Sequence, residues 1–307
     1  MQYIIDRSAP IATGGTAKLY KCQDTIGIRG VCKIMPKSDA TRRKFENEVA
    51  CLKALSFSPK IVQLYDAVEA DTEFALVMEW CRGGAVRDYT YKHGDIYSVN
   101  TVASILRGVL RGLVHVHQVG LVHMDVKPGN VLFTDTSENA EVKLADFGSA
   151  VWEDARKDVN VVAGTAWYMS PESLRSVITS KSDVWSVGVM TYQLLTGRMP
   201  FDDIGPDGPR VSHIWRKIMF EEPIWTGPRW ESIPNEARDF VHLCLVKEPD
   251  ARLSAADCLQ HAWLTKTGCE DRFTGTALVM PPNCRARDEC SYMHARTWEL
   301  RATTHKI

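Results

Sequence analysis

The most informative part of the sequence is His123-Met124-Asp125-Val126-Lys127-Pro128-Gly129-Asn130, followed sixteen residues after Asn130 by Asp146-Phe147-Gly148. Together the two stretches offer carboxylates, a lysine and an amide oxygen. Phosphoryl transfer needs such a set, because a carboxylate must meet the attacking hydroxyl while cations and oxygen-bound Mg²⁺ offset the charge of the phosphates. Asp-Phe-Gly alone is a common type of surface turn. The inference therefore depends on both stretches occurring together and in this order.

The two stretches resemble the catalytic and magnesium-binding loops of eukaryotic protein kinases, which usually read His-Arg-Asp with a downstream Asn, and Asp-Phe-Gly. The resemblance implies that Asp125 orients the substrate hydroxyl and accepts its proton, and that Lys127 steadies the γ-phosphate. It implies that Asn130 and Asp146 hold the metal. ATP and Mg²⁺ are the cofactors that it implies. The expected fold is α+β, with a small antiparallel β lobe carrying one helix and a larger, mainly helical lobe.

Composition is that of an ordinary globular protein: 307 residues, 45% hydrophobic and 24% charged, with a formal net charge of −1. No basic block occurs, so we expect neither nucleic acid nor a membrane surface as a partner. The longest apolar stretch, 184–195, is too short to span a bilayer and is interrupted by polar residues. The nine cysteines follow no metal-ligand spacing, which favours reduced thiols and a cytoplasmic location.

Hydrophobic periodicity divides the chain. Residues 1–78 read as short β-branched runs with one helix at 39–55, and we predict an N-lobe there. A hinge is predicted at 79–83 and a C-lobe at 84–264, which together with the N-lobe make one kinase domain, 1–264. The C-lobe helices are predicted at 99–117, 182–195, 235–245 and 255–260. Residues 265–307 lose periodicity and are predicted to be an extended or partly disordered tail.

Lys33 interrupts an apolar strand, which is costly unless its ammonium has a partner. One interpretation is an edge strand with a solvated lysine. The resemblance favours another, in which Lys33 grips the α- and β-phosphates of ATP and pairs with a glutamate on the following helix. Glu48 fits the spacing for that glutamate better than Glu46 does.

The resemblance places the nucleotide between a glycine-rich loop, a strand and the hinge. The ATP-binding positions that it implies are Ile11, Gly14, Leu19, Val31, Lys33, Met78, Glu79, Cys81 and Leu132. Ala12 and Ala17 replace two of the three usual glycines of the loop, and alanine limits close backbone approach to phosphate oxygens. Taken alone, the segment reads as a hairpin turn, and Met78 reads as core packing.

Further motifs from Gly164-Thr165 to Trp263 also match the family. They imply a buried bridge between Glu172 and Arg252, and they make Asp183 the acid that anchors the catalytic loop. Without the resemblance, Glu172 and Arg252 would be taken for surface charges. Lys127 and Gly164-Thr165 are typical of serine/threonine kinases. From 171 to 264 the sequence is most similar to the calcium/calmodulin-dependent protein kinase group.

Two departures from the family suggest unusual regulation. Met124 replaces the arginine that in many kinases grips a phosphate on the activation segment. No Ser, Thr or Tyr stands between Ala150 and Gly164. A phosphate orders a loop only where cations meet it. We therefore expect activity that does not depend on phosphorylation of this loop.

A third departure concerns substrate choice. Ala85, Gly129 and Gln193 stand at three positions where kinases that select basic peptides commonly carry acids. Charge-assisted pairs with a substrate arginine would then be missing. We expect a weak preference for basic peptides, for which Asp88, Asp202 and Asp203 can compensate.

Two alternatives remain open. Ala12, Ala17 and Met124 suggest a nucleotide-binding pseudokinase or scaffold as the alternative. Because Lys33, Asp125, Asn130 and Asp146 are all intact, we expect an active serine/threonine kinase that transfers the γ-phosphate of ATP to protein hydroxyls. The segment 288–301 reads either as a solvated extension or as a short helix that docks on the kinase or binds calmodulin or another regulator. Its acidic residues spoil the basic face that calmodulin targets usually show.

Overall fold

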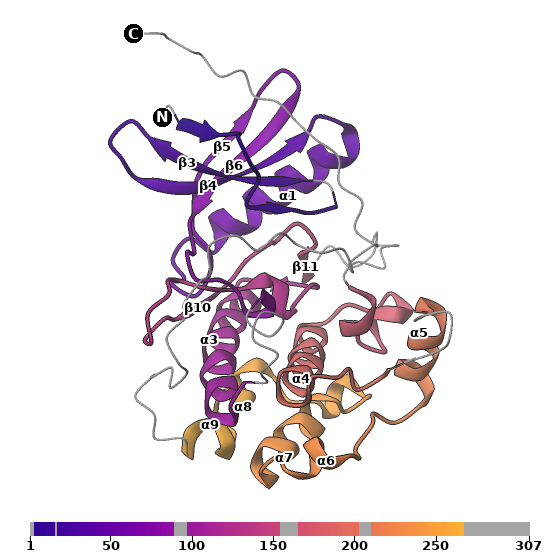
Figure 1. Ribbon diagram of the computed structural model, residues 1–307. Helices are drawn as coiled ribbons and strands as arrows, with labels where there is room; N and C mark the ends of the chain where they lie inside the picture. The colour runs from indigo at the N-terminus through magenta and orange to yellow at the C-terminus, as the bar shows by residue number, and fades with distance from the viewer. Residues whose placement is uncertain (1–2, 16, 89–96, 154–164, 203–209, 267–307) are drawn as a thin grey trace. The chain divides into compact units, whose positions relative to one another are not determined.

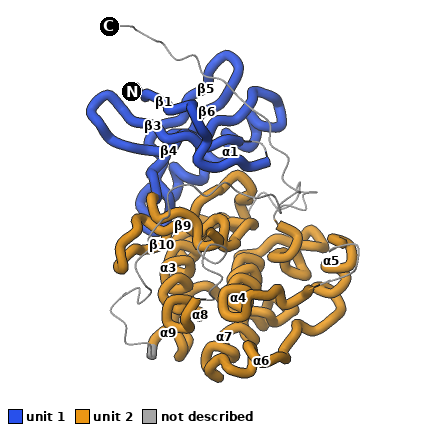
Figure 2. The backbone as a smooth tube through the Cα atoms, viewed as in Figure 1, with its two compact units in different colours: residues 1–81, 279–307 blue, residues 82–278 orange. Residues whose placement is uncertain are grey.

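The computed structural model describes residues 3–15, 17–88, 97–153, 165–202 and 210–266. Within these ranges the chain forms two compact units, the described residues up to 81 and those from 82 to 266 (Figure 2). The first is built mainly of strands and the second mainly of helices (Figure 1). The predicted α+β fold, with an antiparallel β lobe carrying one helix and a larger helical lobe, is confirmed.

The first unit contains an antiparallel sheet with the strand order β1-β3-β4-β6-β5, in which β2 pairs with β3. The strands are β1 (Tyr3–Asp6), β2 (Ala12–Thr13), β3 (Lys18–Asp24), β4 (Arg29–Pro36), β5 (Leu64–Glu69) and β6 (Glu73–Glu79). β4 and β6 lie inside the sheet and are largely buried. A polar side chain among their apolar residues therefore needs a partner.

The helix α1 (Asp39–Ala54) packs against β4, β5 and β6. A capping box fixes its start: the Ser38 hydroxyl accepts the Thr41 N–H at 3.3 Å, and the Thr41 hydroxyl accepts the Ser38 N–H at 3.0 Å. Glu48 and Leu52, one turn apart, are buried on its inward face. The amphipathic helix thus brings one carboxylate, that of Glu48, onto the sheet together with its apolar residues.

The second unit is arranged around α4, which packs against α3 and α7. Its helices are α3 (Val99–Gln118), α4 (Ser180–Thr196), α5 (Val211–Phe220), α6 (Pro228–Glu231), α7 (Asn235–Cys244), α8 (Ala255–Leu259) and α9 (Ala262–Lys266). Short 3₁₀ helices are η1 (Pro128–Asn130), η3 (Ala166–Tyr168), η4 (Ser173–Arg175) and η5 (Pro249–Ala251).

α4 is buried along most of its length. Gly188 permits the close approach of the end of α7, since a β-carbon there would lie 2.7 Å from Cβ of Cys244 and 2.9 Å from Cδ2 of Leu245. The helix ends at Gly197, whose φ of +73° is readily adopted only by glycine. α4 is therefore a fixed element against which loops of the unit can be anchored.

Short strands position those loops. β7 (Gly84–Ala85), β9 (Val131–Phe133) and β10 (Val142–Leu144) form one sheet in the order β10-β9-β7, and β8 (Leu121–Val122) pairs with β11 (Val151–Trp152). The segment 123–130 connects β8 to β9, and Asp146 follows β10. Because β9 and β10 are adjacent and antiparallel, the end of η1 and the start of the Asp146 loop lie at the same edge of that sheet.

The predicted helices correspond to α1, α3, α4, α7 and α8, with ends that agree to within two residues. α5, α6 and α9 were not predicted. α6 and α9 are too short to show a helical period, with four and five residues. The proposed boundary at 264 stays a prediction, because α9 continues to Lys266 and the tail from 267 lies outside the described residues.

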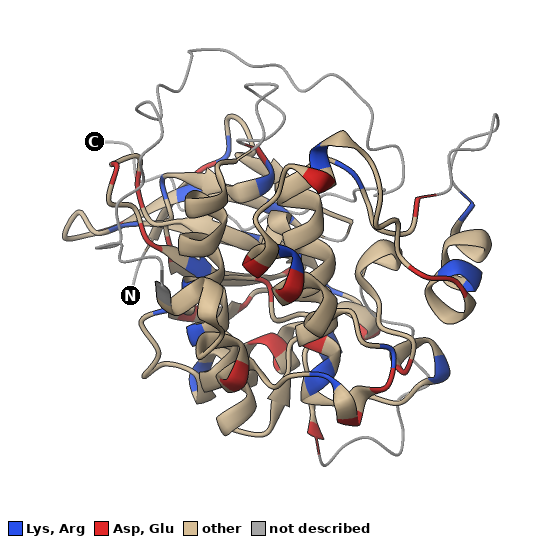
Figure 3. Ribbon diagram, turned by 90° about the horizontal axis from the view of Figure 1, so that it is seen from below, with Lys and Arg blue, Asp and Glu red and all other residues tan. Residues whose placement is uncertain are grey.

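Residues of both charge signs are interspersed along the described strands and helices (Figure 3). This distribution accords with the formal net charge of −1. Of the helices that the structure describes, none has both the length and the apolar character that a membrane crossing requires.

Candidate active site

Lys33 lies on β4, between β3 and β6, so the interpretation as an edge-strand lysine is wrong. Its Nζ lies 2.8 Å from both carboxylate oxygens of Glu48. The Glu48 side chain is 1% exposed and the Lys33 side chain 13% exposed. A buried charge of this kind requires a partner of opposite sign. The structure thus joins the two residues that the sequence predicts as a pair.

Glu46, the rival of Glu48, points elsewhere. It pairs with Arg42 one turn earlier on α1 at 3.5 Å, and its side chain is 59% exposed. An exposed pair of this kind contributes little to stability. The choice of Glu48 over Glu46 therefore agrees with the geometry.

The segment predicted as a phosphate loop is a β2–β3 hairpin, in which Ala12 pairs with Leu19. The Gly14 N–H donates to the Ala17 carbonyl at 2.8 Å across the turn, and the Ile11 N–H donates to the Leu19 carbonyl at 2.8 Å. Ile11 is exposed, whereas Ala17 is buried. The hairpin expected from local sequence is present. Binding of ATP phosphates by this hairpin stays a prediction.

Other predicted nucleotide positions are neighbours in the sheet register. Leu19 lies opposite Lys33, and Val31 lies opposite Met78. Val31 and Met78 are both buried, as core packing also requires. The remaining predicted positions are Glu79 at the end of β6, Cys81 at the end of the first unit, and Leu132 on β9 in the second. Nucleotide binding by these residues remains a prediction.

In the second unit, Asp125 is the centre of a hydrogen-bonded network. Its Oδ2 accepts from Nζ of Lys127 at 2.7 Å and from Nδ2 of Asn130 at 2.9 Å. The Asn130 amide also donates to the Asp125 carbonyl at 2.8 Å. Asp125 and Asn130 are both buried. Charge-assisted bonds such as these fix the orientation of a carboxylate.

Thr165 is a member of this network to which the sequence gave no individual role. Its N–H and hydroxyl donate to Oδ1 of Asp125 at 3.1 and 3.0 Å, and its Oγ1 accepts from Nζ of Lys127 at 2.7 Å. Thr165 is forty positions from Asp125, so no local pattern reveals the contact. Its neighbour Gly164, the other half of the predicted motif, lies outside the described residues.

Asp183 anchors the start of the catalytic loop. Its carboxylate accepts the main-chain N–H groups of His123 at 2.8 Å and Met124 at 2.9 Å, and it contacts Nε2 of His117 at 2.9 Å. Burial alone would raise the pKa of Asp183. The hydrogen bond and charge of His117, reinforced by His123, outweigh that effect and lower the pKa below its ordinary value.

Asp146 and Asn130 are brought together by a main-chain bond from the Ala145 N–H to the Asn130 carbonyl, at 2.9 Å. Asp146 has a φ of +63°, which is uncommon for a residue with a β-carbon. The Asn130 Nδ2 is turned to Asp125, so its amide oxygen faces away from that carboxylate. A carboxylate and an amide oxygen are hard donors of the kind that Mg²⁺ prefers, so the pair fits the metal.

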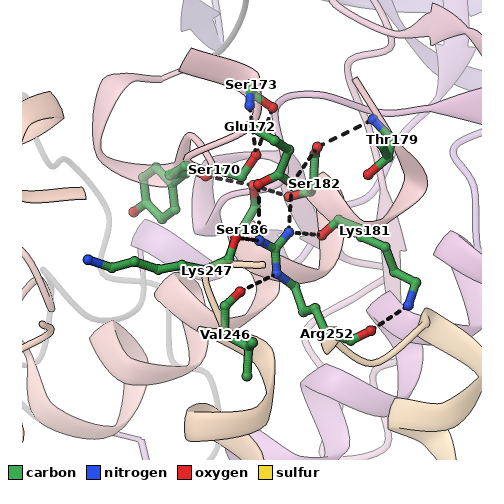
Figure 4. Close-up of polar contacts among 11 residues, drawn as sticks. Ser170, Glu172, Ser173, Thr179, Lys181, Ser182, Ser186, Val246, Lys247 and Arg252 are labelled. Carbon is green, nitrogen blue, oxygen red and sulfur yellow. Dashed lines mark hydrogen bonds and ion pairs between the residues drawn. The ribbon is translucent and has the colours of Figure 1, made fainter. Parts of the chain in front are cut away.

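Glu172 and Arg252 form a buried bidentate ion pair, with Nη1–Oε1 2.6 Å and Nη2–Oε2 3.0 Å (Figure 4). The Ser182 hydroxyl donates to Glu172 at 2.9 Å. Burial would raise the pKa of Glu172, but the hydrogen bonds and charge of Arg252 outweigh it and hold the pKa below its usual value. The interpretation as two surface charges is therefore wrong.

Known proteins resemble this chain along most of its length. The family model for the protein kinase domain matches residues 6–264. CDPK-related kinase 8 of Arabidopsis thaliana is 36% identical over 236 residues, which cover 76% of this chain and 38% of that protein. Calcium-dependent protein kinase 29 of Arabidopsis thaliana is 34% identical over 284 residues, covering 90% and 52%. A CDPK-related protein kinase of Daucus carota is 34% identical over 236 residues, covering 76% and 38%.

The matched regions span between 38% and 52% of the length of these three relatives. Their names agree with the predicted likeness to the calcium/calmodulin-dependent group. The matched range contains the Lys33–Glu48 pair, the Asp125 network and the Glu172–Arg252 pair. With its fold, its site geometry and this match in agreement, the chain belongs to the protein kinase domain family.

Proposed function

We propose that this chain is an active serine/threonine protein kinase, which transfers the γ-phosphoryl group of ATP to Ser or Thr hydroxyls of protein substrates. The observation that carries the proposal is the Asp125 network. Lys127, Asn130 and Thr165 orient both carboxylate oxygens of Asp125. A carboxylate positioned in this way can accept a hydrogen bond from a substrate hydroxyl and take its proton as the phosphoryl group is transferred.

Lys33 supplies the second part of the proposed chemistry. Glu48 fixes its ammonium by two hydrogen bonds of 2.8 Å. A positioned ammonium offsets the charge of the α- and β-phosphates and orients them. Because an incorrectly placed phosphate reacts slowly, we assign Lys33 and Glu48 to positioning and not to proton transfer.

Protein kinases generally use ATP with Mg²⁺, and Asn130 and Asp146 are the residues that would hold the metal here. When bound, Mg²⁺ supplies charge neutralisation at the phosphate oxygens. Asn130 then has two functions, because its amide nitrogen also orients Asp125. We expect Asn130→Ala to weaken both metal use and the orientation of Asp125.

We also propose that activity does not require phosphorylation of the activation segment. Met124 supports this, because its thioether side chain is buried in an apolar cluster with Val122 and Ile178, against which Val151 packs. An apolar group at this place cannot pair with a phosphate. Residues 154–164 of the segment lie outside the described residues, so the argument rests on Met124 and on the sequence. Activity that phosphatase treatment abolishes, and that only modification within residues 149–165 restores, would contradict it.

Six described cysteines are free and buried, and burial raises the pKa of the Cys32 thiol to about 12. Thiols of this kind fit a reducing compartment, and we propose a cytoplasmic location. Regulation by calmodulin through residues 288–301 also stays a proposal, since that segment lies outside the described residues. Titration of a peptide of this segment with calcium-loaded calmodulin tests it, and no complex at micromolar concentration would exclude it.

The proposed activity is tested by Asp125→Asn, which keeps the size of the side chain but removes the base. Transfer of the γ-phosphate from ATP and Mg²⁺ to mixed Ser/Thr peptides should fall by about 10²- to 10⁴-fold. Asp71→Asn, the same change in the exposed β5–β6 turn, is the matched control and should leave the rate unaltered. No transfer by the wild-type chain, together with measurable ATP binding, would favour the pseudokinase instead.

A further inference from the structure

Gly129 has no side chain and leaves space beside the Asp125 network. The guanidinium of Arg87 occupies this space. A β-carbon on Gly129 would lie 3.3 Å from Nη1 and 3.7 Å from Cζ of Arg87, and 3.9 Å from Cε of Lys127. The guanidinium of Arg87 therefore lies against the loop that carries Asp125. Any larger side chain at Gly129 would compete with Arg87 for this space.

The backbone before Arg87 is firmly positioned. β7 pairs with β9 directly after η1, so that Ala85 lies opposite Leu132. Val86 is fully buried, and its carbonyl accepts the hydroxyl of Tyr97 at 2.9 Å. Arg87 is thus presented beside η1 by a paired strand and a buried neighbour.

The two cations beside Gly129 differ in how they are neutralised. Nζ of Lys127 is bonded to Asp125 and Thr165, both at 2.7 Å. Nε of Arg87 lies 3.6 Å from Oδ1 of its neighbour Asp88, too far for a hydrogen bond, and the two side chains are 49% and 45% exposed. An exposed pair of this length holds the guanidinium only loosely, so its N–H groups are able to turn to another acceptor. Arg87 can therefore attract a further anion.

Ala85 and Gln193 are the other two positions at which kinases that select basic peptides commonly carry acids. Neither has a negative charge here. Ala85 is buried, and Gln193 has a neutral carboxamide whose Oε1 accepts the Tyr168 hydroxyl at 2.5 Å. Near η1, the carboxylate of Asp125 is already bonded within its own network. Beside Gly129, the described residues thus offer a bound peptide the guanidinium of Arg87, with Asp88 as its exposed neighbour.

We propose that Arg87, seated against Gly129, is a specificity-determining residue that binds a negatively charged side chain of the substrate. This inference rests on the proposed kinase function and names its substrate class: peptides with an acidic or phosphorylated residue near the target hydroxyl. The planar guanidinium fork pairs with carboxylate and with phosphate in two-bond geometry. Gly129 stands four positions after Asp125 in the same loop, so we place the anion close to the target hydroxyl.

The test uses the full chain and peptide libraries in which Glu, phosphoserine, Arg or Ala is fixed at each position within about five residues of a single target serine. We expect one position at which Glu or phosphoserine raises kcat/KM over Arg by about tenfold, mainly through KM, as one charge-assisted pair allows. A stronger response to phosphoserine than to Glu would identify prior phosphorylation as the source of the anion.

Arg87→Glu should abolish that selection and favour Arg at the same position. Gly129→Glu should also abolish it, because the new carboxylate would lie within reach of Arg87, so the result does not depend on one variant folding. Arg43→Glu makes the same change of charge on the exposed face of α1 and should retain the wild-type preference. Arg87→Lys keeps the charge without the fork and should lower the selection about threefold.

The outcomes separate the two proposals. Transfer by the wild-type chain without acidic selection, or acidic selection that survives both Arg87→Glu and Gly129→Glu, overturns the role of Arg87 and leaves the kinase function standing. Failure of the wild-type chain to transfer phosphate to any peptide overturns both.

Discussion

The two units each contain a buried ion pair, and the pairs differ in how completely the cation is enclosed. In the first unit, Lys33 lies 2.8 Å from both oxygens of Glu48, and its side chain is 13% exposed. In the second, the Arg252 side chain is 0% exposed beside Glu172. Arg252 also lies over the Trp185 ring, with Cζ 5.1 Å from its centroid.

All five N–H groups of Arg252 are matched by acceptors. Besides Glu172, they are the carbonyls of Val246 at 2.9 Å, Lys181 at 2.7 Å and Lys247 at 3.2 Å (Figure 4). A cation with every donor bonded and no exposed surface is suited to connecting segments of the chain. A lysine that solvent still reaches is suited to meeting a ligand. We expect this difference to separate a pair that stabilises the fold from one that takes part in the proposed phosphoryl transfer.

The largest effect on stability is expected for Arg252→Ala. The change leaves Glu172 buried without its partner and frees the three carbonyls, so the free energy of unfolding should fall by about 3–5 kcal/mol. Urea unfolding monitored by Trp fluorescence measures the loss. The double variant Glu172→Leu with Arg252→Met should recover part of it, because no charge is then left buried. A loss below about 1 kcal/mol for Arg252→Ala would show that the pair is dispensable.

Lys33→Met should lower the rate of phosphoryl transfer far more than it lowers the stability of the fold. Removing the ammonium from its position should lower phosphoryl transfer by about 100-fold or more, as loss of one preorganised charge does in other enzymes. The free energy of unfolding should fall by about 1–3 kcal/mol, less than for Arg252→Ala, because Glu48 loses its partner but three main-chain carbonyls are not freed as well. Parallel transfer assays and urea titrations measure both. A stability loss as large as that of Arg252→Ala would remove the distinction between the two pairs.

The acid dependence of stability should depend on Glu172. Its pKa is lower in the folded chain than its ordinary value of about 4.3, so its contribution to stability is present above that pH and is lost as pH falls through the folded pKa. Asp183 acts in the same direction. Glu172→Gln should therefore show a shallower loss of unfolding free energy than wild type between pH 5 and 2, measured by urea titration at each pH. Equal slopes would mean that Glu172 keeps its ordinary pKa.

The smallest effect is expected for Glu46→Gln. This exposed partner of Arg42 should change the free energy of unfolding by less than about 0.5 kcal/mol and leave phosphoryl transfer unchanged. Glu48→Gln, the same change two residues later, should lower transfer because Lys33 loses its anionic partner. If both variants behaved alike in the transfer assay, burial would not be what distinguishes the two glutamates.

The sequence predicted the strands of the first unit and the long helices of the second because their periodicity is strong. It also placed Lys33, Asp125, Asn130 and Asp146 in loops and strands that the structure contains. Periodicity could not reveal α6 or α9, which are too short to display a repeat. Length is not the whole explanation, because α8, with five residues, was predicted and α5, with ten, was missed.

Contacts between residues far apart in the sequence were harder to predict. Thr165 and Arg87 reach the catalytic loop from segments about forty residues away on either side, and neither carries a local signal for that contact. Glu172 and Arg252, eighty positions apart, were paired only through the family resemblance. Their burial could not be derived from composition, because charged residues are usually exposed. Contacts of this kind become apparent only once the fold of the whole unit is known.

The bonds of Asp183 have a consequence for the order of folding. The carboxylate lies about sixty positions from the two N–H groups that it accepts, and Met124 has a φ of +67°. A residue with a β-carbon rarely stays in that conformation unless its surroundings require it. The loop should therefore reach its native conformation only after α4 has docked. On warming, activity should disappear as α4 loosens, before the helices themselves have melted.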